Sequence, residues 1–190
     1  MFDLVSAGPA GAWLIECEVH KDARGDFMRN WSLEVFHEVG IAFTPVQANT
    51  STTAQRGTIR GMHFQHAPRQ EAKLVRCARG RIFDVITDLR PASATYRQSC
   101  NFELGKDTAL LYVPTGFAHG YQTLTDDVVV EYLMNERYAP DLADGFRYDD
   151  PAAAICWPLP AGLVSDRDLA WPRLEGREFW NSSLGQAGQA

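Results

Sequence analysis

Four side chains that could move protons stand out in the sequence. The segments GTIRGMHFQ and PTGFAHG contain His63 and His119, while Lys73 opens the run KLVRC and Tyr132 lies in DVVVEYLM. An imidazole exchanges a proton near neutral pH, a phenol can donate one, and an ammonium stabilises a developing oxyanion. These residue types together indicate an acid–base site, provided that the fold brings them into one cavity.

The two histidine segments resemble the two halves of the cupin signature, in which a small jelly-roll barrel presents histidines to its interior. Metal-binding cupins carry H-x-H followed by Glu in the first half. Here Gln65 stands in place of the second histidine, so His63, Glu71 and His119 form an incomplete ligand set. We therefore expect no metal and no other cofactor, which leaves the histidines free for proton transfer and argues against a metal-dependent cupin oxygenase.

Lys73 and Tyr132 also have structural explanations. Lys73 shares one strand face with Val75 and Cys77, so it needs either an anionic partner or a place on an edge strand, where lysine blocks aggregation. Tyr132 lies in an apolar row that begins at Val128, as a core tyrosine with a bonded hydroxyl would. The pattern alone leaves both interpretations open for each residue.

Basic residues are concentrated in one stretch of an otherwise acidic chain. Between Gln55 and Arg81 only Glu71 is acidic, and seven residues are basic: Arg56, Arg60, Arg69, Lys73, Arg76, Arg79 and Arg81. This stretch predicts either a local anion site or a solvated basic face.

The elements that must position these residues are mostly strands. Short β-branched and aromatic runs, beginning at Lys73, Arg81, Ala109 and Asp127, are separated by Gly, Pro and Asp. This pattern predicts an all-β fold, either a sandwich or a barrel. From Pro140 onward the chain is rich in Pro, Asp and Trp, which is typical of ordered loops wrapped over such a core.

One short helix is predicted near the N-terminus, in NWSLEVFHEVG. Asn30 or Ser32 could cap it, Leu33 and Phe36 share an apolar face with Val39, and the following glycine supplies the stop. Little else in the sequence looks helical.

Length and composition favour one globular domain. The 190 residues are 45% hydrophobic and 22% charged, so we expect a single domain over residues 1–190, with a flexible tail at about 182–190. Eighteen basic against 24 acidic residues give a formal charge of -6, which argues against nucleic-acid binding and against an anionic membrane surface.

Membrane and secretory classes are also disfavoured. No apolar stretch approaches the roughly 20 residues that span a bilayer, and the N-terminus lacks the basic region of a secretory signal. We therefore expect a cytoplasmic protein. Four cysteines without C-x-x-C spacing are expected to be reduced and mostly structural: Cys17, Cys77, Cys100 and Cys156.

Motifs along nearly the whole chain, from about residue 14 to 174, resemble those of the dTDP-4-dehydrorhamnose 3,5-epimerase family. In order they are DARGDF, QANTS, RGMHFQ, KLVR, GRIFDV, DLR, PTGFAHG, DDP, ICWP and SDRD. The resemblance implies a cupin jelly roll, a homodimer with strand exchange or cross-subunit packing, and metal-free catalysis. It also implies inversion of C3 and C5 of dTDP-4-keto-6-deoxyglucose. Both carbons are α to the C4 ketone, so either proton can be removed to give an enolate.

The resemblance also implies residue roles. His63 matches the base that removes the α-protons, and Asp168 matches the carboxylate that orients it. Tyr132 matches the proton donor on the opposite face, and Lys73 matches a residue near the C4 oxygen. The resemblance further implies that seven residues contact the substrate: Arg24, Gln47, Asn49, Arg60, His119, Tyr138 and Arg167. Among them, Tyr138 matches an aromatic residue that stacks on the nucleotide base.

The chain departs from the family pattern at four positions that lie where the family binds sugar or nucleotide. His20 replaces a common Phe, Arg29 and Ala143 replace Glu, and Arg167 replaces the usual Lys. These departures leave open an epimerase of a different nucleotide sugar. Two further alternatives also stay open: a mono-epimerase acting at C3 or C5 alone, which would share the same catalytic set, and a non-catalytic cupin that binds a sugar nucleotide or merely dimerises.

Overall fold

A computed structural model describes residues 2–6, 11–106 and 109–179. Within these residues it contains thirteen strands and two short helices. The strands are β1 (Phe2–Ser6), β2 (Trp13–Cys17), β3 (Val19–Asp22), β4 (Gly25–Met28), β5 (Gln47–Thr53), β6 (Ile59–Gln65), β7 (Lys73–Arg79), β8 (Arg81–Asp88), β9 (Ser99–Gly105), β10 (Leu110–Val113), β11 (Phe117–Thr123), β12 (Val128–Met134) and β13 (Ala143–Gly145). The helices are α1 (Leu33–Glu38) and α2 (Asp166–Ala170). The predicted all-β class is confirmed.

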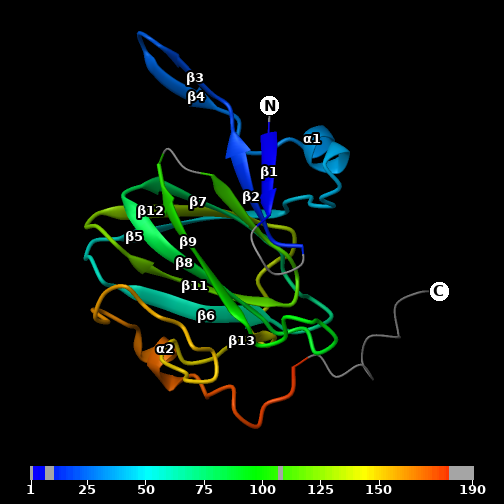
Figure 1. Cartoon of the computed structure of the whole chain (residues 1–190), viewed down its shortest axis with the longest axis vertical. Helices are drawn as coiled ribbons and strands as arrows, with labels where there is room; N and C mark the ends of the chain where they lie inside the picture. The colour runs from blue at the N-terminus through cyan, green and yellow to red at the C-terminus, as the bar shows by residue number, and fades with distance from the viewer. Residues whose placement is uncertain (1, 7–10, 107–108, 180–190) are drawn as a thin grey trace, which may run out of the picture.

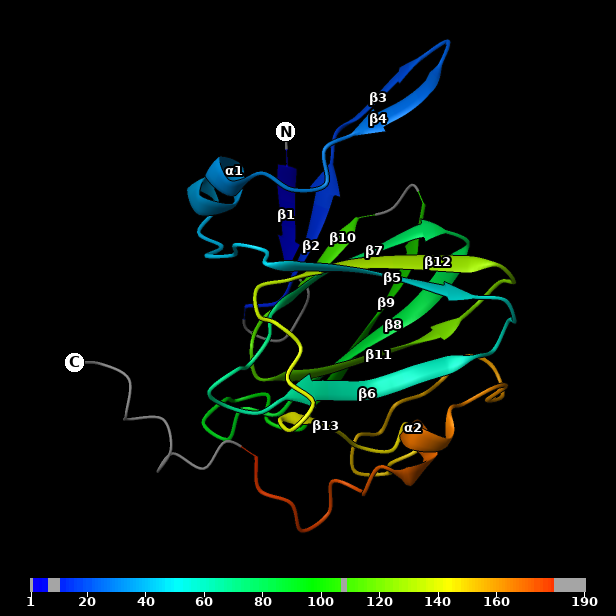
Figure 2. The same cartoon turned by 180° about the vertical axis from the view of Figure 1, so that it is seen from behind.

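Two antiparallel sheets face each other in a sandwich (Figures 1 and 2). The six-stranded sheet has the order β1-β2-β10-β7-β12-β5, and the five-stranded sheet has the order β13-β6-β11-β8-β9. Strands β3 and β4 pair only with each other and form a hairpin that projects from the sandwich (Figure 1). Strands that the sequence predicted at β7, β8, β10 and β12 are all present.

The main core lies between the two sheets. Strand β12 buries Val128 and Val130 and turns Glu131 outward, as the alternation of side chains requires. Val75 from the six-stranded sheet and Ile86 from the five-stranded sheet belong to the same buried cluster. Each aliphatic side chain of this kind stabilises the fold by roughly 1.5–3 kcal/mol through its burial.

Further apolar clusters cover the outer face of each sheet. Phe36 of α1 packs with Ile15 and Leu74 of the six-stranded sheet. On the other side, Phe146 and Leu174 of the C-terminal segment pack against the five-stranded sheet. This segment runs as loops beneath β6 (Figure 1), which confirms the expected loop-rich wrapping; the expected flexible tail at about 182–190 lies outside the described residues.

The N-terminal helix is confirmed as α1. Gly40, at φ +80°, ends it in a conformation that glycine adopts without strain. Ser32 is the N-cap residue, but its hydroxyl bonds Glu34 Oε2 at 2.8 Å instead of a backbone N–H. Phe36 is buried, whereas Leu33 is 37% exposed, so the predicted apolar face is only partly buried.

A second short helix, α2, was not predicted from the sequence. It has only five residues, fewer than two turns, so no apolar periodicity could indicate it. The sequence feature that marks this helix is its polar N-cap. Ser165 caps the helix, and its hydroxyl accepts a hydrogen bond from the Asp168 N–H at 3.1 Å. The sequence S-D-R-D has the form of a capping box.

The edge-strand explanation of Lys73 is also wrong. Strand β7 is paired on one side with β10 and on the other with β12, so Lys73 lies in a central strand. Nor does the basic stretch form one solvated face. Arg56 and Arg79 are exposed and bind the backbone carbonyl groups of Leu124 and Asp127, at 2.9 and 2.7 Å, whereas Lys73 is buried.

None of the helices in the described residues is long and apolar enough to cross a membrane. The four cysteines are unpaired, as expected.

Candidate active site

A cavity of about 620 Å³ opens between the two sheets and is lined by residues from both. Ten of the eleven predicted site residues line it: Gln47, Asn49, Arg60, His63, Lys73, His119, Tyr132, Tyr138, Arg167 and Asp168. Residues far apart in the sequence therefore meet in one place, as an acid–base site requires.

The two sheets contribute different chemistry to this cavity. Lys73 on β7 and Tyr132 on β12 belong to the six-stranded sheet. His63 on β6 and His119 on β11 belong to the five-stranded sheet. A ligand held between the sheets therefore meets imidazoles on one face and a phenol and an ammonium on the other.

His63 is bonded to a buried carboxylate. Its Nε2 lies 2.6 Å from Asp168 Oδ1, although the two residues are 105 positions apart in sequence. The His63 side chain is 41% exposed, whereas that of Asp168 is only 5% exposed. The tautomer that donates from Nε2 to Asp168 leaves Nδ1 with a lone pair that can accept a proton.

Asp168 is held by donors from three directions. Its carboxylate accepts hydrogen bonds from the Gly61 N–H and the Trp171 indole N–H, both at 3.3 Å, in addition to His63. Burial works to raise the pKa of Asp168, but the His63 hydrogen bond and charge, with the other two donors, hold that pKa below its ordinary value. The carboxylate is therefore ionised at neutral pH and fixes the imidazole in one orientation.

His119 has a second carboxylate partner, which the sequence did not reveal. Its Nε2 lies 3.0 and 2.9 Å from the two oxygens of Asp84, whose side chain is fully buried. Burial raises the pKa of Asp84, while His119 and Lys73 oppose that increase. The charged Asp84 in the buried strand RIFDVITD indicated that a partner must exist, but the sequence did not indicate that this partner is His119.

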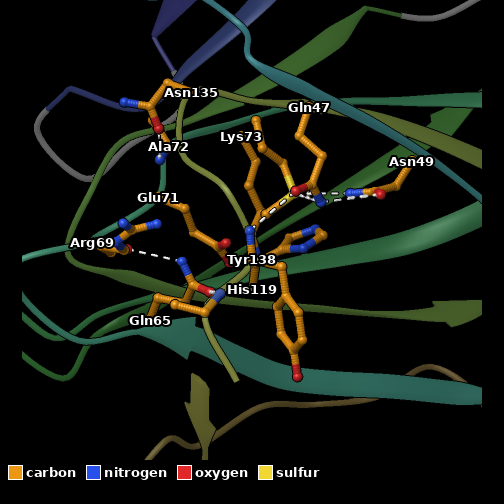
Figure 3. Close-up of polar contacts among 12 residues, drawn as sticks. Gln47, Asn49, Gln65, Arg69, Glu71, Ala72, Lys73, His119, Asn135 and Tyr138 are labelled. Atoms are coloured by element: carbon orange, nitrogen blue, oxygen red, sulfur yellow. Dashed lines mark hydrogen bonds and ion pairs between the residues drawn. The ribbon is translucent and has the colours of Figure 1, made fainter. Parts of the chain in front are cut away.

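Lys73 is paired inside the cavity with Glu71. Its Nζ lies 3.0 Å from Glu71 Oε1, and both side chains are more than nine-tenths buried. The expectation that Lys73 needs an anionic partner is met by a protein carboxylate. Figure 3 shows both side chains directed toward the centre of the site, beside His119.

The hydroxyl of Tyr132 has no hydrogen-bond partner among the described residues, so the structural explanation of a bonded core tyrosine does not hold. Burial raises the pKa of Tyr132; nearby Arg60 lowers it and Glu71 raises it further. The phenol is therefore protonated at neutral pH and available to donate.

Polar side chains at the edge of the cavity are tied to one another. Gln47 Nε2 donates to Asn49 Oδ1 at 3.2 Å, and Gln47 Oε1 accepts from the Tyr138 N–H at 3.1 Å (Figure 3). Arg167 Nη1 donates to the Tyr138 hydroxyl at 3.3 Å, and its guanidinium lies 5.2 Å from the Trp171 ring centroid. Tyr138 is 48% exposed and presents an aromatic surface at the opening.

Gln65, which takes the place of a cupin metal ligand, is used by the fold. Its amide donates to the carbonyl groups of Arg69 and Arg137 at 2.9 and 3.3 Å and accepts from the Ala139 N–H at 2.6 Å. Over the described ranges, no group of three or more His, Cys, Asp or Glu side chains could hold a metal ion.

Arg24 is the one predicted site residue that this chain does not bring to its own cavity. It lies in the turn between β3 and β4, its side chain is 91% exposed, and it pairs with Asp22 at 2.5 Å. Figures 1 and 2 both show this hairpin projecting away from the sandwich.

Two departures from the family pattern fall at different places. Ala143 lines the cavity, next to Asp144, which bonds His66 at 2.7 Å and pairs with Arg177. His20 lies on β3 of the projecting hairpin, with a side chain that is 62% exposed.

Comparison with known proteins accounts for this arrangement. The family model for dTDP-4-dehydrorhamnose 3,5-epimerase matches residues 9–176. The curated dTDP-4-dehydrorhamnose 3,5-epimerase of Methanothermobacter thermautotrophicus is 38% identical over 177 residues, covering 91% of this chain and 95% of that protein.

Solved structures agree with the family match. The dTDP-4-dehydrorhamnose 3,5-epimerase of Bacillus anthracis, with TDP and PPi bound, superposes with a TM-score of 0.89 at 36% identity, covering 92% of this chain and all of the other. A 3'-monoepimerase from Streptomyces bikiniensis in complex with dTDP-quinovose gives a TM-score of 0.82 at 31% identity, covering 87% and 85% of the two chains. The cupin-type jelly roll is thereby confirmed, and the chain belongs to the dTDP-4-dehydrorhamnose 3,5-epimerase family of isomerases.

Proposed function

We propose that this protein inverts C3 and C5 of a dTDP-linked 4-keto-6-deoxy sugar, converting dTDP-4-dehydro-6-deoxyglucose to dTDP-4-dehydrorhamnose. Both carbons are adjacent to the C4 ketone, which makes their protons acidic enough to be removed by a positioned base. Each inversion requires a base on one face of the ring and an acid on the other.

His63 is the base in this mechanism. Asp168 accepts the Nε2 hydrogen at 2.6 Å, which leaves Nδ1 as the proton acceptor and stabilises the imidazolium that forms. Asp168 thus acts as a positioning residue through His63. The 41% exposure of the His63 side chain leaves it accessible to a ligand in the cavity.

Lys73 and Tyr132 complete the chemistry from the other sheet. When a proton leaves C3 or C5, negative charge develops on the C4 oxygen, and the buried Lys73 ammonium stabilises it. Tyr132, whose pKa is raised mainly by burial, then donates a proton to the opposite face of the carbon.

The observation that carries this proposal is the placement of acid and base on opposing sheets. His63 on β6 and Tyr132 on β12 line one cavity but belong to different layers of the sandwich. A sugar ring bound between the layers would meet the base on one face and the acid on the other. A binding protein has no need for such a pair, which makes the non-catalytic alternative less favoured.

The remaining cavity residues are proposed to hold the substrate. Arg60 supplies positive charge for the diphosphate, and Gln47 and Asn49 supply amides for the sugar or nucleotide. The Tyr138 ring stacks on the nucleotide base at the opening of the cavity, and Arg167 donates a hydrogen bond to its hydroxyl. His119, fixed by Asp84, contacts the sugar from the side of the five-stranded sheet.

We further propose a cytoplasmic homodimer in which the projecting hairpin contacts the partner chain. Phe27 on β4 is 66% exposed, so its apolar ring is available to pack against a partner chain. Insertion of the hairpin into the partner would bury Phe27 and carry Arg24 toward the partner's cavity, where its charge suits a diphosphate.

Deuterium incorporation from D₂O tests the reaction directly. The protein is incubated with dTDP-4-keto-6-deoxyglucose, and labelling at each carbon is followed by NMR against an enzyme-free control. Labelling at both C3 and C5 is expected. Labelling at one carbon alone would instead support a mono-epimerase, and the Streptomyces bikiniensis relative is named as a 3'-monoepimerase. No labelling above the control would contradict the proposal for this substrate.

A further inference from the structure

The ion pair between Glu71 and Lys73 leaves one carboxylate oxygen unused. Glu71 Oε1 lies 3.0 Å from Lys73 Nζ. Oε2 is buried, and no described residue donates a hydrogen bond to it. The Glu71 side chain is only 7% exposed, so the protein forgoes solvation of this oxygen without replacing it, which is costly for a charged acceptor.

Two of the donors that line the cavity with Glu71 are committed to other groups, and the hydroxyl of Tyr132 does not bond Oε2 either. The Gln65 amide nitrogen donates to two backbone carbonyl groups, and His119 Nε2 is bonded to Asp84. Glu71, Lys73 and His119 all line the cavity, and Figure 3 shows the Glu71 carboxylate beside the other two. A donor for Oε2 can therefore come from a molecule bound in the cavity.

We propose that Glu71 Oε2 accepts a hydrogen bond from the C3 hydroxyl of the substrate sugar. This inference rests on the proposed function, in which Lys73 Nζ donates to the C4 oxygen. Lys73 Nζ lies 3.0 Å from the Glu71 carboxylate, so the two groups are close enough to contact oxygens on adjacent carbons of one sugar ring. A sugar that places O4 on Lys73 thus brings its C3 hydroxyl to Glu71.

This contact makes Glu71 a specificity-determining residue. A 3-hydroxy sugar satisfies the buried oxygen, whereas a sugar without that hydroxyl leaves it unpaired. Sites built to bind a hydroxyl reject an analogue that lacks it far more strongly than apolar pockets reject a missing methylene. The same carboxylate holds the Lys73 side chain in position through the 3.0 Å ion pair.

A cycle that alters both the enzyme and the substrate tests the contact. The substrates are dTDP-4-keto-6-deoxyglucose and its 3-deoxy analogue, and the enzymes are the wild type and Glu71→Gln. Deuterium exchange at C5 is measured for every combination, because C5 is adjacent to the ketone in both sugars. The amide of the variant keeps the side-chain shape but offers one oxygen where the carboxylate offers two.

Removing the hydroxyl is expected to lower kcat/KM of the wild type on the order of 10- to 100-fold, the range for a hydrogen bond to a charged group. In Glu71→Gln the two substrates should differ by less than about 3-fold, because the contact is already weakened. If the two substrates differ in kcat/KM as much in Glu71→Gln as they do in the wild type, the proposal is overturned. Absence of exchange with the parent sugar in the wild type would instead contradict the proposed function.

Glu131→Gln is the matched control. Glu131 also pairs with a basic residue of β7, Arg76 at 3.2 Å, but its side chain is 45% exposed and lies outside the cavity. This variant should keep the wild-type ratio between the two substrates. Thermal unfolding checks that each variant folds. If Glu71→Gln fails to fold, Glu71→Ser also removes the acceptor, and the two substrates should again differ by less than about 3-fold in kcat/KM.

Discussion

His63 and His119 lie directly opposite each other on adjacent strands, yet each is bonded to its own carboxylate. The side chain of His63 is 41% exposed and that of His119 is 8% exposed, while the Asp84 partner of His119 is fully buried. Two chemically similar pairs are thus placed side by side on the cavity wall, and the imidazole of His63 is far more exposed than that of His119. Accessibility distinguishes the proposed base from its neighbour.

His63→Ala should abolish deuterium exchange at both C3 and C5, because no other open imidazole replaces the base. Binding of dTDP, measured by calorimetry, should change little, because the proposed nucleotide contacts lie at the edge of the cavity. Exchange near the wild-type rate in this variant would refute the assignment of the base.

Tyr132→Phe should impair inversion more than it impairs exchange. Without the hydroxyl, His63 can still remove a proton and return a deuteron to the same face, so labelling continues while the configuration is retained. NMR of the labelled sugar reports both quantities in one sample. Unchanged epimerisation would remove Tyr132 from the mechanism.

Asp168→Asn should lower kcat for exchange by roughly 10²–10⁴-fold, because an amide no longer fixes the imidazole tautomer or stabilises the imidazolium. Asp166→Asn is the matched control, since Asp166 is an exposed acid in the first turn of the same helix. It should retain wild-type exchange. Equal losses in the two variants would point to damage to α2 instead of to the pairing with His63.

Co-expression of two inactive variants tests whether Arg24 acts in the partner's cavity. Arg24→Ala and His63→Ala should each have low activity when expressed alone. In a mixed dimer, the chain that keeps His63 receives Arg24 from its partner, so random pairing restores about a quarter of the sites. No gain in activity on co-expression would contradict the exchanged hairpin, as would a monomeric mass for the wild type by light scattering.

Acid should destabilise the fold through Asp88. Its fully buried carboxylate is bonded by Arg90, Ser93 and Thr95. Burial works to raise the pKa of Asp88, but these bonds lower it from 3.8 to about 2. A folded-state pKa below the unfolded one stabilises the protein above about pH 4, and this contribution is lost as the pH falls toward 2.

Urea unfolding of Asp88→Asn should therefore show a loss of about 2 kcal/mol at pH 7 that shrinks as the wild type is titrated toward pH 2. The control is Asp149→Asn, which breaks a similar pair with Arg147, two residues away, at the surface. Exposed pairs contribute less than about 1 kcal/mol. Equal losses at pH 7 would contradict the special role of Asp88.

Four of the thirteen described strands, including the two that present Lys73 and Tyr132, and ten of the residues that line the cavity could be predicted from the sequence, because alternation and family motifs are local signals. The pairings of Asp84 with His119 and of Glu71 with Lys73 could not be predicted. Which side chains meet depends on strand register and on packing between elements, which no short window of sequence contains.

Helix α2 was not predicted, and Arg24 was predicted as a substrate contact but does not lie in this chain's own cavity. The helix is too short for apolar periodicity, and only its Ser165 cap marks it. Arg24 was grouped with the cavity residues by its motif, but motif order does not specify whether a residue acts within its own chain or across a subunit boundary.

The distance in sequence between His63 and Asp168 also sets an order of events during synthesis. Every strand of both sheets precedes α2, so the sandwich can assemble while the helix is still inside the ribosome. His63 acquires its carboxylate partner only when Ser165 and the residues after it emerge. A nascent chain with both sheets formed therefore still lacks the hydrogen bond between His63 and Asp168, and the proposed acid–base site is completed among the last steps of folding.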